Sequence, residues 1–85
     1  MNVLLIGSGT MGSVHANAYV SMDDVNLVGI VDIRAEKGEP LANKCKTQYF
    51  ASFEEAVQLL QTIDVIDICL PTYLHKEYVF KAADQ

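Results

Sequence analysis

The spacing of the apolar residues changes along this 85-residue chain in a regular alternation, and that alternation restricts the folds open to it. Short continuous apolar runs, typical of strands buried on both faces, occur at residues 2–6, 26–32 and 64–71, and residues 47–51 could form a further short strand. Stretches with helical spacing occur between and after them, at residues 10–22, 35–45, 52–61 and 73–84. Strands that alternate with helices predict an α/β fold, a Rossmann-type doubly wound parallel sheet with strand order 3-2-1-4.

Three of the predicted helices carry distinct signals. In the first, one apolar stripe is expected to face the sheet, formed by Met11, Val14, Ala18 and Met22. In the second, Pro40 would cost about 3 kcal/mol in a helix interior, so we expect that helix to begin near it. The third opens with a capping box, in which Ser52 is the N-cap and Glu55 follows three residues later.

Composition narrows the class of protein. The net charge is −5 and no lysine or arginine cluster occurs, which argues against nucleic acid as a partner. The first residues lack a basic leader and a long apolar run, and no stretch approaches the roughly 18 apolar residues that span a bilayer. We therefore expect a cytoplasmic protein without a membrane partner. Cys45 and Cys69 form no CxxC pair, so a disulfide is the less favoured reading, and Cys69 is expected to be a small buried hydrophobe.

Three glycines directly follow the first apolar run, in the spacing Gly7-x-Gly9-x-x-Gly12. Other glycine loops share these letters. The phosphate-loop pattern GxxxxGK[ST] fails, because Ser13 stands where it needs lysine. The kinase pattern GxGxxGxV fits as far as Val14, but a kinase needs far more chain.

The dinucleotide-binding fingerprint needs a strand before the glycines, a helix after them and an acidic residue about 20 positions later. All three conditions are met, since Asp32 ends the second apolar run. Gly7 would form the tight turn, Gly9 would let the pyrophosphate approach the backbone, and Gly12 would let the helix pack closely. Packing alone is the competing explanation of the glycines.

Asp32 is expected to accept hydrogen bonds from the adenine-ribose hydroxyls and to repel a 2′-phosphate, which favours NAD. Arg34 lies two residues later and could accommodate that phosphate, so NADP stays open as the second cofactor.

Three segments resemble the N-terminal part of the Gfo/Idh/MocA oxidoreductases: GSGTMGSVHANAY, VGIVDI and VIDICLPTYLH. The resemblance runs from Met1 to Gln85. It implies a nicotinamide-dependent oxidoreductase that acts on a sugar, a polyol or a related carbonyl compound. It also implies a second, larger α/β domain after the Rossmann part. The third segment separates this reading from other Rossmann proteins such as FAD or nucleotide-sugar enzymes.

The resemblance also places the loop 70–72 near the nicotinamide side of the cofactor and His75 in the helix that follows. Where the family often has threonine before the proline, this chain has Leu70. The candidate cofactor-binding residues are Gly7, Ser8, Gly9, Thr10, Met11, Gly12, Asp32, Ile33, Arg34, Leu70, Pro71, Thr72 and His75.

Simpler roles compete for several of these residues. Pro71 could only stop a strand, and Thr72 could only cap a helix. His15 and His75 are more typical of packed, hydrogen-bonded histidines than of catalysts, and two isolated histidines do not predict a metal site.

The resemblance places the family's catalytic residues, a lysine among them, beyond Gln85, so no catalytic residue is expected within this chain. The 85 residues are expected to form a partial NAD(P)-binding domain, cut before its fifth strand and without its substrate domain. They are expected to be catalytically silent alone. An unpaired fourth strand would favour homo-oligomers by edge pairing. The alternative function is a non-enzymatic dinucleotide-binding module that senses redox state or regulates a partner.

Overall fold

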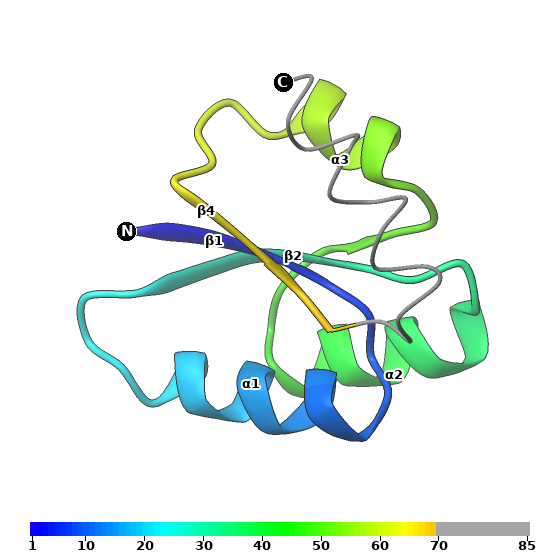
Figure 1. Cartoon of the computed structure of the whole chain (residues 1–85), viewed down its shortest axis with the longest axis horizontal. Helices are drawn as coiled ribbons and strands as arrows, with labels where there is room; N and C mark the ends of the chain where they lie inside the picture. Colours follow the sequence, from blue (N-terminus) through cyan, green and yellow to red (C-terminus); the bar gives the residue numbers. More distant parts are fainter. Residues whose placement is uncertain (70–85) are drawn as a thin grey trace.

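Four parallel strands form the centre of the fold, and the computed structural model describes residues 1–69. The strands are β1 (Asn2–Ile6), β2 (Asn26–Val31), β3 (Tyr49–Phe50) and β4 (Val65–Ile68). Their order in the sheet is β3-β2-β1-β4, which confirms the predicted 3-2-1-4 arrangement. Figure 1 shows β1 and β4 side by side, although they lie at opposite ends of the described chain.

Helices cover both faces of this sheet, as a doubly wound fold requires. The helices are α1 (Thr10–Val20), α2 (Ala35–Lys44) and α3 (Phe53–Leu59). α1 and α2 lie on one face and α3 lies on the other (Figure 1). The fully buried side chains of β1 alternate between the two layers, since Leu4 and Ile6 pack on the α3 side and Leu5 packs on the α1–α2 side. The apolar run at residues 2–6 is therefore a strand buried on both faces, as predicted.

The prediction for the buried face of α1 is wrong. Met11 and Val14 are 59% and 57% exposed, and Ala18 and Met22 are also exposed. The residues that α1 buries are Gly12 and Ala16. Because these side chains are absent or small, the helix backbone lies close to the sheet and the larger apolar side chains of α1 point to solvent.

The predicted start of α2 is also wrong, because the helix begins at Ala35 and holds Pro40 inside it. A proline there removes one backbone hydrogen bond, to the carbonyl of Glu36 four residues earlier. Glu36 and Pro40 are both exposed, so water can bind the carbonyl that proline leaves free. Gly38 is buried, and a Cβ at this position would lie 2.4 Å from Cε1 of Tyr49. The glycine is therefore what lets α2 lie against β3.

The third helix begins as predicted. The Oγ atom of Ser52 accepts a hydrogen bond from the backbone N–H of Glu55 at 3.1 Å. β4 forms one edge of the sheet among the strands of residues 1–69, and its pairing with another chain stays a prediction. The predicted helix 73–84 lies outside the described residues. Within residues 1–69, none of the helices has the length and apolar character needed to cross a bilayer.

Candidate dinucleotide-binding site

The glycine turn leaves the carboxyl end of β1 through a conformation that favours glycine. Gly7 has φ 100°, in the left-handed region, and its N–H donates to the carbonyl of Val31 at 2.7 Å. This bond ties the turn to the end of the neighbouring strand β2. The tight turn predicted for Gly7 is therefore present, and it places the next residues at the sheet's carboxyl edge.

Gly12 and Gly9 are glycines for different reasons. A Cβ on Gly12 would lie 2.2 Å from the carbonyl oxygen of Gly7, so close packing of α1 requires glycine there. Within residues 1–69, a Cβ on Gly9 would have no atom within 4 Å apart from its own chain neighbours. Gly9 has φ −72° and is the N-cap of α1, so neither backbone strain nor packing explains it. The open space beside Gly9 is where an anion would meet the free N–H groups and the positive dipole end of α1.

Asp32 follows β2 directly and is held in place by two partners. Its Oδ2 accepts hydrogen bonds from the backbone N–H of Ser8 at 3.0 Å and from Ser8 Oγ at 2.5 Å. Its Oδ1 accepts from the backbone N–H of Arg34 at 2.8 Å and from Arg34 Nε at 3.2 Å, while Arg34 Nη2 lies 3.1 Å from Oδ2. The carboxylate therefore joins the glycine turn to the segment after β2.

These contacts decide the charge state of Asp32. The residue is 3% exposed, and burial alone would raise the pKa of its carboxyl group. The hydrogen bonds from Arg34 and Ser8 outweigh burial and hold the pKa below its usual value. Asp32 is thus an ionised acceptor whose negative charge is partly balanced by Arg34.

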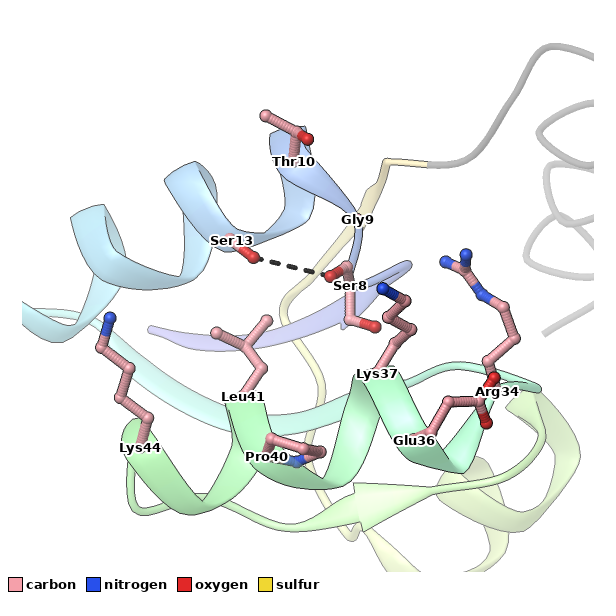
Figure 2. A pocket seen from close by; sticks show the side chains of 10 residues that line it. All are labelled: Ser8, Gly9, Thr10, Ser13, Arg34, Glu36, Lys37, Pro40, Leu41 and Lys44. Atoms are coloured by element: carbon pink, nitrogen blue, oxygen red, sulfur yellow. Dashed lines mark hydrogen bonds between the residues drawn. The ribbon is translucent and has the colours of Figure 1, made fainter.

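Two cavities lie on either side of the glycine turn. The first has a volume of about 660 Å³ and lies between the turn and α2 (Figure 2). Figure 2 shows Lys37 and Lys44 extending from α2 toward α1, and Ser13 Oγ donates to the carbonyl of Ser8 at 3.5 Å. The second cavity, of about 570 Å³, is bounded by Gly9, Thr10 and Met11 on one side and by Ile68 and Cys69 at the end of β4.

Gly9, Thr10 and Arg34 line both cavities. The two spaces therefore meet at the open side of Gly9, and together they reach from α2 to the end of β4. In open parallel sheets, ligands bind beyond the carboxyl ends of the strands, where the strand order reverses. Here that point lies between β1 and β4, at the second cavity.

A polar cluster that sequence reasoning missed lies at the second cavity. His15 Nδ1 is 2.6 Å from Asp67 Oδ2, and the Tyr19 hydroxyl donates to the same oxygen at 2.5 Å. Cys69 Sγ is 3.2 Å from His15 Nδ1 and donates to Asp67 Oδ1 at 3.7 Å. Cys69 is half-buried and packs against the core cluster on the α1–α2 side, as a small hydrophobe was predicted to do, but its thiol also has polar neighbours.

The cluster does not activate the thiol. Burial and the negative charge of Asp67 raise the pKa of Cys69 to about 11, and burial and Asp67 raise the pKa of Tyr19 to about 12. For Asp67 itself, burial acts to raise the pKa, but hydrogen bonds from Tyr19 and His15 lower it below its usual value. At neutral pH the arrangement therefore holds a carboxylate and a neutral thiol, which is a poor nucleophile.

Residues 1–85 match the family described as the Gfo/Idh/MocA oxidoreductase family, NAD-binding Rossmann fold. The match covers the chain from end to end. This chain belongs to the Gfo/Idh/MocA oxidoreductase family.

Relatives and solved structures agree with this membership. The D-glucoside 3-dehydrogenase of Escherichia coli is 29% identical over 99% of this chain and 24% of its own length. A myo-inositol dehydrogenase structure from Corynebacterium glutamicum superposes with TM-score 0.88 and 32% identity, covering 99% of this chain and 25% of that one. The structure of GenD2 from gentamicin A biosynthesis, in complex with NAD, gives TM-score 0.79 and 27% identity over 84% of this chain and 20% of that one. This Gfo/Idh/MocA chain thus spans about a quarter of the length of the proteins it matches.

The fold of this Gfo/Idh/MocA chain gathers most of the candidate cofactor residues at one edge of the sheet. The glycine turn (residues 7–12) and the segment 32–34 meet there through the bonds between Ser8 and Asp32. Ile33 is 70% exposed beside them. Lys37 and Lys44 line the first cavity. The sequence did not indicate this position, because a charged residue on a helix usually faces solvent.

The remaining predicted site residues cannot be placed at this edge, because they lie outside the described residues 1–69. They are Leu70, Pro71, Thr72 and His75. Gln85 also lies outside that range, and the expectation that the catalytic residues follow it stays a prediction.

Proposed function

We propose that this chain is the cofactor-binding part of an NAD(P)-dependent oxidoreductase that acts on a sugar, a polyol or a related carbonyl compound. The observation that carries the proposal is the open position of Gly9 at the junction of the two cavities. A glycine that no neighbour requires, at the start of a helix and beside a buried carboxylate, is best explained by a ligand that needs the space. The names of the matched dehydrogenases support the oxidoreductase class and do not favour the sensing module.

In this proposal, different residues at the carboxyl ends of the strands hold different parts of the cofactor. The N–H groups at the start of α1 bind the pyrophosphate beside Gly9. Asp32 accepts hydrogen bonds from the adenine-ribose hydroxyls, with the adenosine in the cavity next to α2. The nicotinamide half then lies in the second cavity, toward the end of β4. Bound NAD accepts or delivers a hydride at its nicotinamide ring, and the protein fixes the substrate carbon against that ring.

NAD is the preferred cofactor in this proposal because Asp32 is ionised, and its negative charge would repel a 2′-phosphate on the adenine ribose. The Arg34 contact balances part of that charge, which weakens the repulsion of a 2′-phosphate. We therefore expect NADP to bind less tightly than NAD but measurably. Titration calorimetry with both cofactors tests this order, and tighter binding of NADP would contradict it.

The decisive experiment replaces Gly9 with alanine. Gly9→Ala should lower the melting temperature only slightly, by the cost of alanine at an N-cap, and should weaken NAD binding by about 10-fold or more, because the added methyl group occupies space that residues 1–69 leave open. Unchanged NAD affinity in this variant would contradict the proposed site. We also infer that these 85 residues bind NAD without reducing it, and production of NADH from a polyol by the isolated chain would contradict that.

A further inference from the structure

Three chemically different donor atoms meet between α1 and β4, at His15, Asp67 and Cys69. Their donor atoms all lie within 4.8 Å of one another, and all three residues are half-buried. Asp67 and Cys69 alternate with Ile68, so they project from the same face of the β4 segment, and His15 reaches them from α1. Imidazole nitrogen, carboxylate oxygen and thiolate sulfur are the donors that zinc takes in proteins.

We propose that His15, Asp67 and Cys69 form a zinc-binding site. This inference does not rest on the proposed cofactor function, although the site borders the second cavity, in which that proposal places the nicotinamide half. The site supplies three protein ligands, and the fourth position is left for water or an external ligand, as in zinc sites with an open position. His15 and Cys69 also line the second cavity, so an external ligand can reach that fourth position.

The distances fit a tetrahedral ion once the Asp67 carboxylate, which faces His15 through Oδ2 and Cys69 through Oδ1, turns to present a single oxygen to the metal. Around zinc, a nitrogen and an oxygen ligand lie about 3.3 Å apart, and a sulfur lies about 3.5 Å from either. The observed separations are 3.7 Å from Cys69 Sγ to Asp67 Oδ1 and 3.2 Å from Cys69 Sγ to His15 Nδ1. The His15–Asp67 separation of 2.6 Å is a hydrogen bond, and it must widen by about 0.7 Å when the metal replaces the shared proton.

Charge also favours a divalent ion here. One carboxylate and one thiolate balance the two positive charges of zinc, so the bound site is neutral, which suits a half-buried position. Binding releases the thiol proton of Cys69 to solvent, because a coordinated thiol is deprotonated. Coordination through Nδ1 requires the His15 ring proton to be on Nε2, so the proton shared between Nδ1 and Asp67 Oδ2 must leave that nitrogen when the metal binds.

Tyr19 is a positioning residue for this site. Its hydroxyl donates to Asp67 Oδ2, the oxygen that also faces His15. Hydrogen bonds of this kind orient ligating carboxylates, and their loss typically weakens metal binding by about 10- to 100-fold. Tyr19→Phe removes this bond and keeps the ring.

Cobalt(II) is the probe, because thiolate-bound cobalt gives a charge-transfer band in the near ultraviolet. The full chain, freed of metal and of any affinity tag, is titrated with cobalt chloride, and zinc chloride is then added. We expect one cobalt per chain, a thiolate band and loss of that band on addition of zinc. Absence of the band in the unaltered chain overturns the proposal.

The chain has two cysteines, which gives a matched control. Cys69→Ser keeps the size of the side chain and should abolish the band, whereas Cys45→Ala, at the end of α2, should retain it. Tyr19→Phe should lower the zinc affinity by about 10-fold or more while the band remains. A band that survives Cys69→Ser or His15→Gln overturns the site. Far-ultraviolet circular dichroism and amide NMR spectra confirm that each variant is folded before it is scored.

Discussion

The α-carbon of Gly12 faces the carbonyl oxygen of Gly7 so closely that a Cβ at position 12 would lie 2.2 Å from that oxygen. Both atoms belong to backbone, so neither can rotate away as a side chain could. The pair fixes the distance between the start of α1 and the end of β1, and with it the width of the glycine turn.

Gly12→Ala should therefore destabilise the fold by about 1–3 kcal/mol or more, the usual cost of overpacking. Gly9→Ala should lower the free energy of unfolding by less than about 1 kcal/mol, the cost of alanine at an N-cap, because its methyl group meets no atom of residues 1–69. Urea denaturation of the two variants measures the contrast. Equal destabilisation would show that Gly9 also has a packing role.

The ionisation of Asp32 should make the free energy of unfolding depend on pH in the acidic range. Its pKa is lowered in the folded protein below the ordinary value of 3.8, so the unfolded chain binds the proton more readily. The stabilisation is fully present above pH 3.8 and is lost as the pH falls through the lower folded-state pKa. We expect Asp32→Asn to be less stable than the unaltered chain at pH 6 and closer to it at pH 3.

Denaturant titrations at pH 6 and pH 3 test this dependence. Asp23→Asn, at an exposed aspartate between α1 and β2, provides the control. A stability difference between Asp32→Asn and the unaltered chain that is as large at pH 3 as at pH 6 would exclude the ionised carboxylate as its source.

Asp32 should also discriminate between cofactors. Hydrogen bonds to a charged group are worth about 1.5–3 kcal/mol, so Asp32→Ala should weaken NAD binding by about 10- to 100-fold. NADP binding should fall less or rise, since the repulsion of the 2′-phosphate is removed while Arg34 remains. Calorimetric titration with each cofactor gives the ratio, and a ratio that does not move toward NADP would contradict the assignment.

Gly38 and Tyr49 should be energetically coupled. Alanine is normally better than glycine inside a helix by about 1 kcal/mol, but here its methyl group would lie 2.4 Å from the Tyr49 ring. That ring cannot swing aside freely, because its hydroxyl donates to the carbonyl of Asp32 at 2.5 Å. Gly38→Ala should destabilise the chain when Tyr49 is present and cost clearly less in a Tyr49→Ala background, where the remaining close contact is 3.2 Å to Asp32 Cβ. A double-mutant cycle measures the coupling, and simple additivity would contradict the contact.

The N-cap of α3 offers a smaller test. Ser52→Ala removes the hydrogen bond to the Glu55 N–H and should cost about 1 kcal/mol. Ser52→Asp should retain most of that stability, because its carboxylate can accept the same bond. Thermal unfolding of the two variants separates loss of the cap from a general effect of substitution at this position.

The glycine turn and Asp32 could be predicted because their spacing along the chain sets their geometry. The strand order followed in the same way from the alternation of apolar patterns. The burial of α1 could not, because the close approach of its backbone at Gly12 and Ala16 leaves no room for larger side chains. The prediction assigned Met11 and Val14 to the buried face from their hydrophobicity alone, and both are exposed.

The contact between His15 and Asp67 was hidden for a different reason. The two residues are 52 positions apart. They meet only because β4 pairs with β1 and Asp67 projects from the sheet face that α1 covers. Nothing local to either residue indicates the other. Cys69, two residues after Asp67, acquires its polar surroundings from the same crossing.

The pairing of β1 with β4 has a consequence for biosynthesis. Val3 pairs with Val65, and at about 5–20 residues per second a ribosome adds the intervening segment in roughly 3–12 s. Throughout that interval, the edge of β1 that receives β4 has backbone donors and acceptors without their final partners, the condition that favours pairing with other nascent chains. Of the four strands in residues 1–69, β1 is thus made before the others but is among the last to be completed.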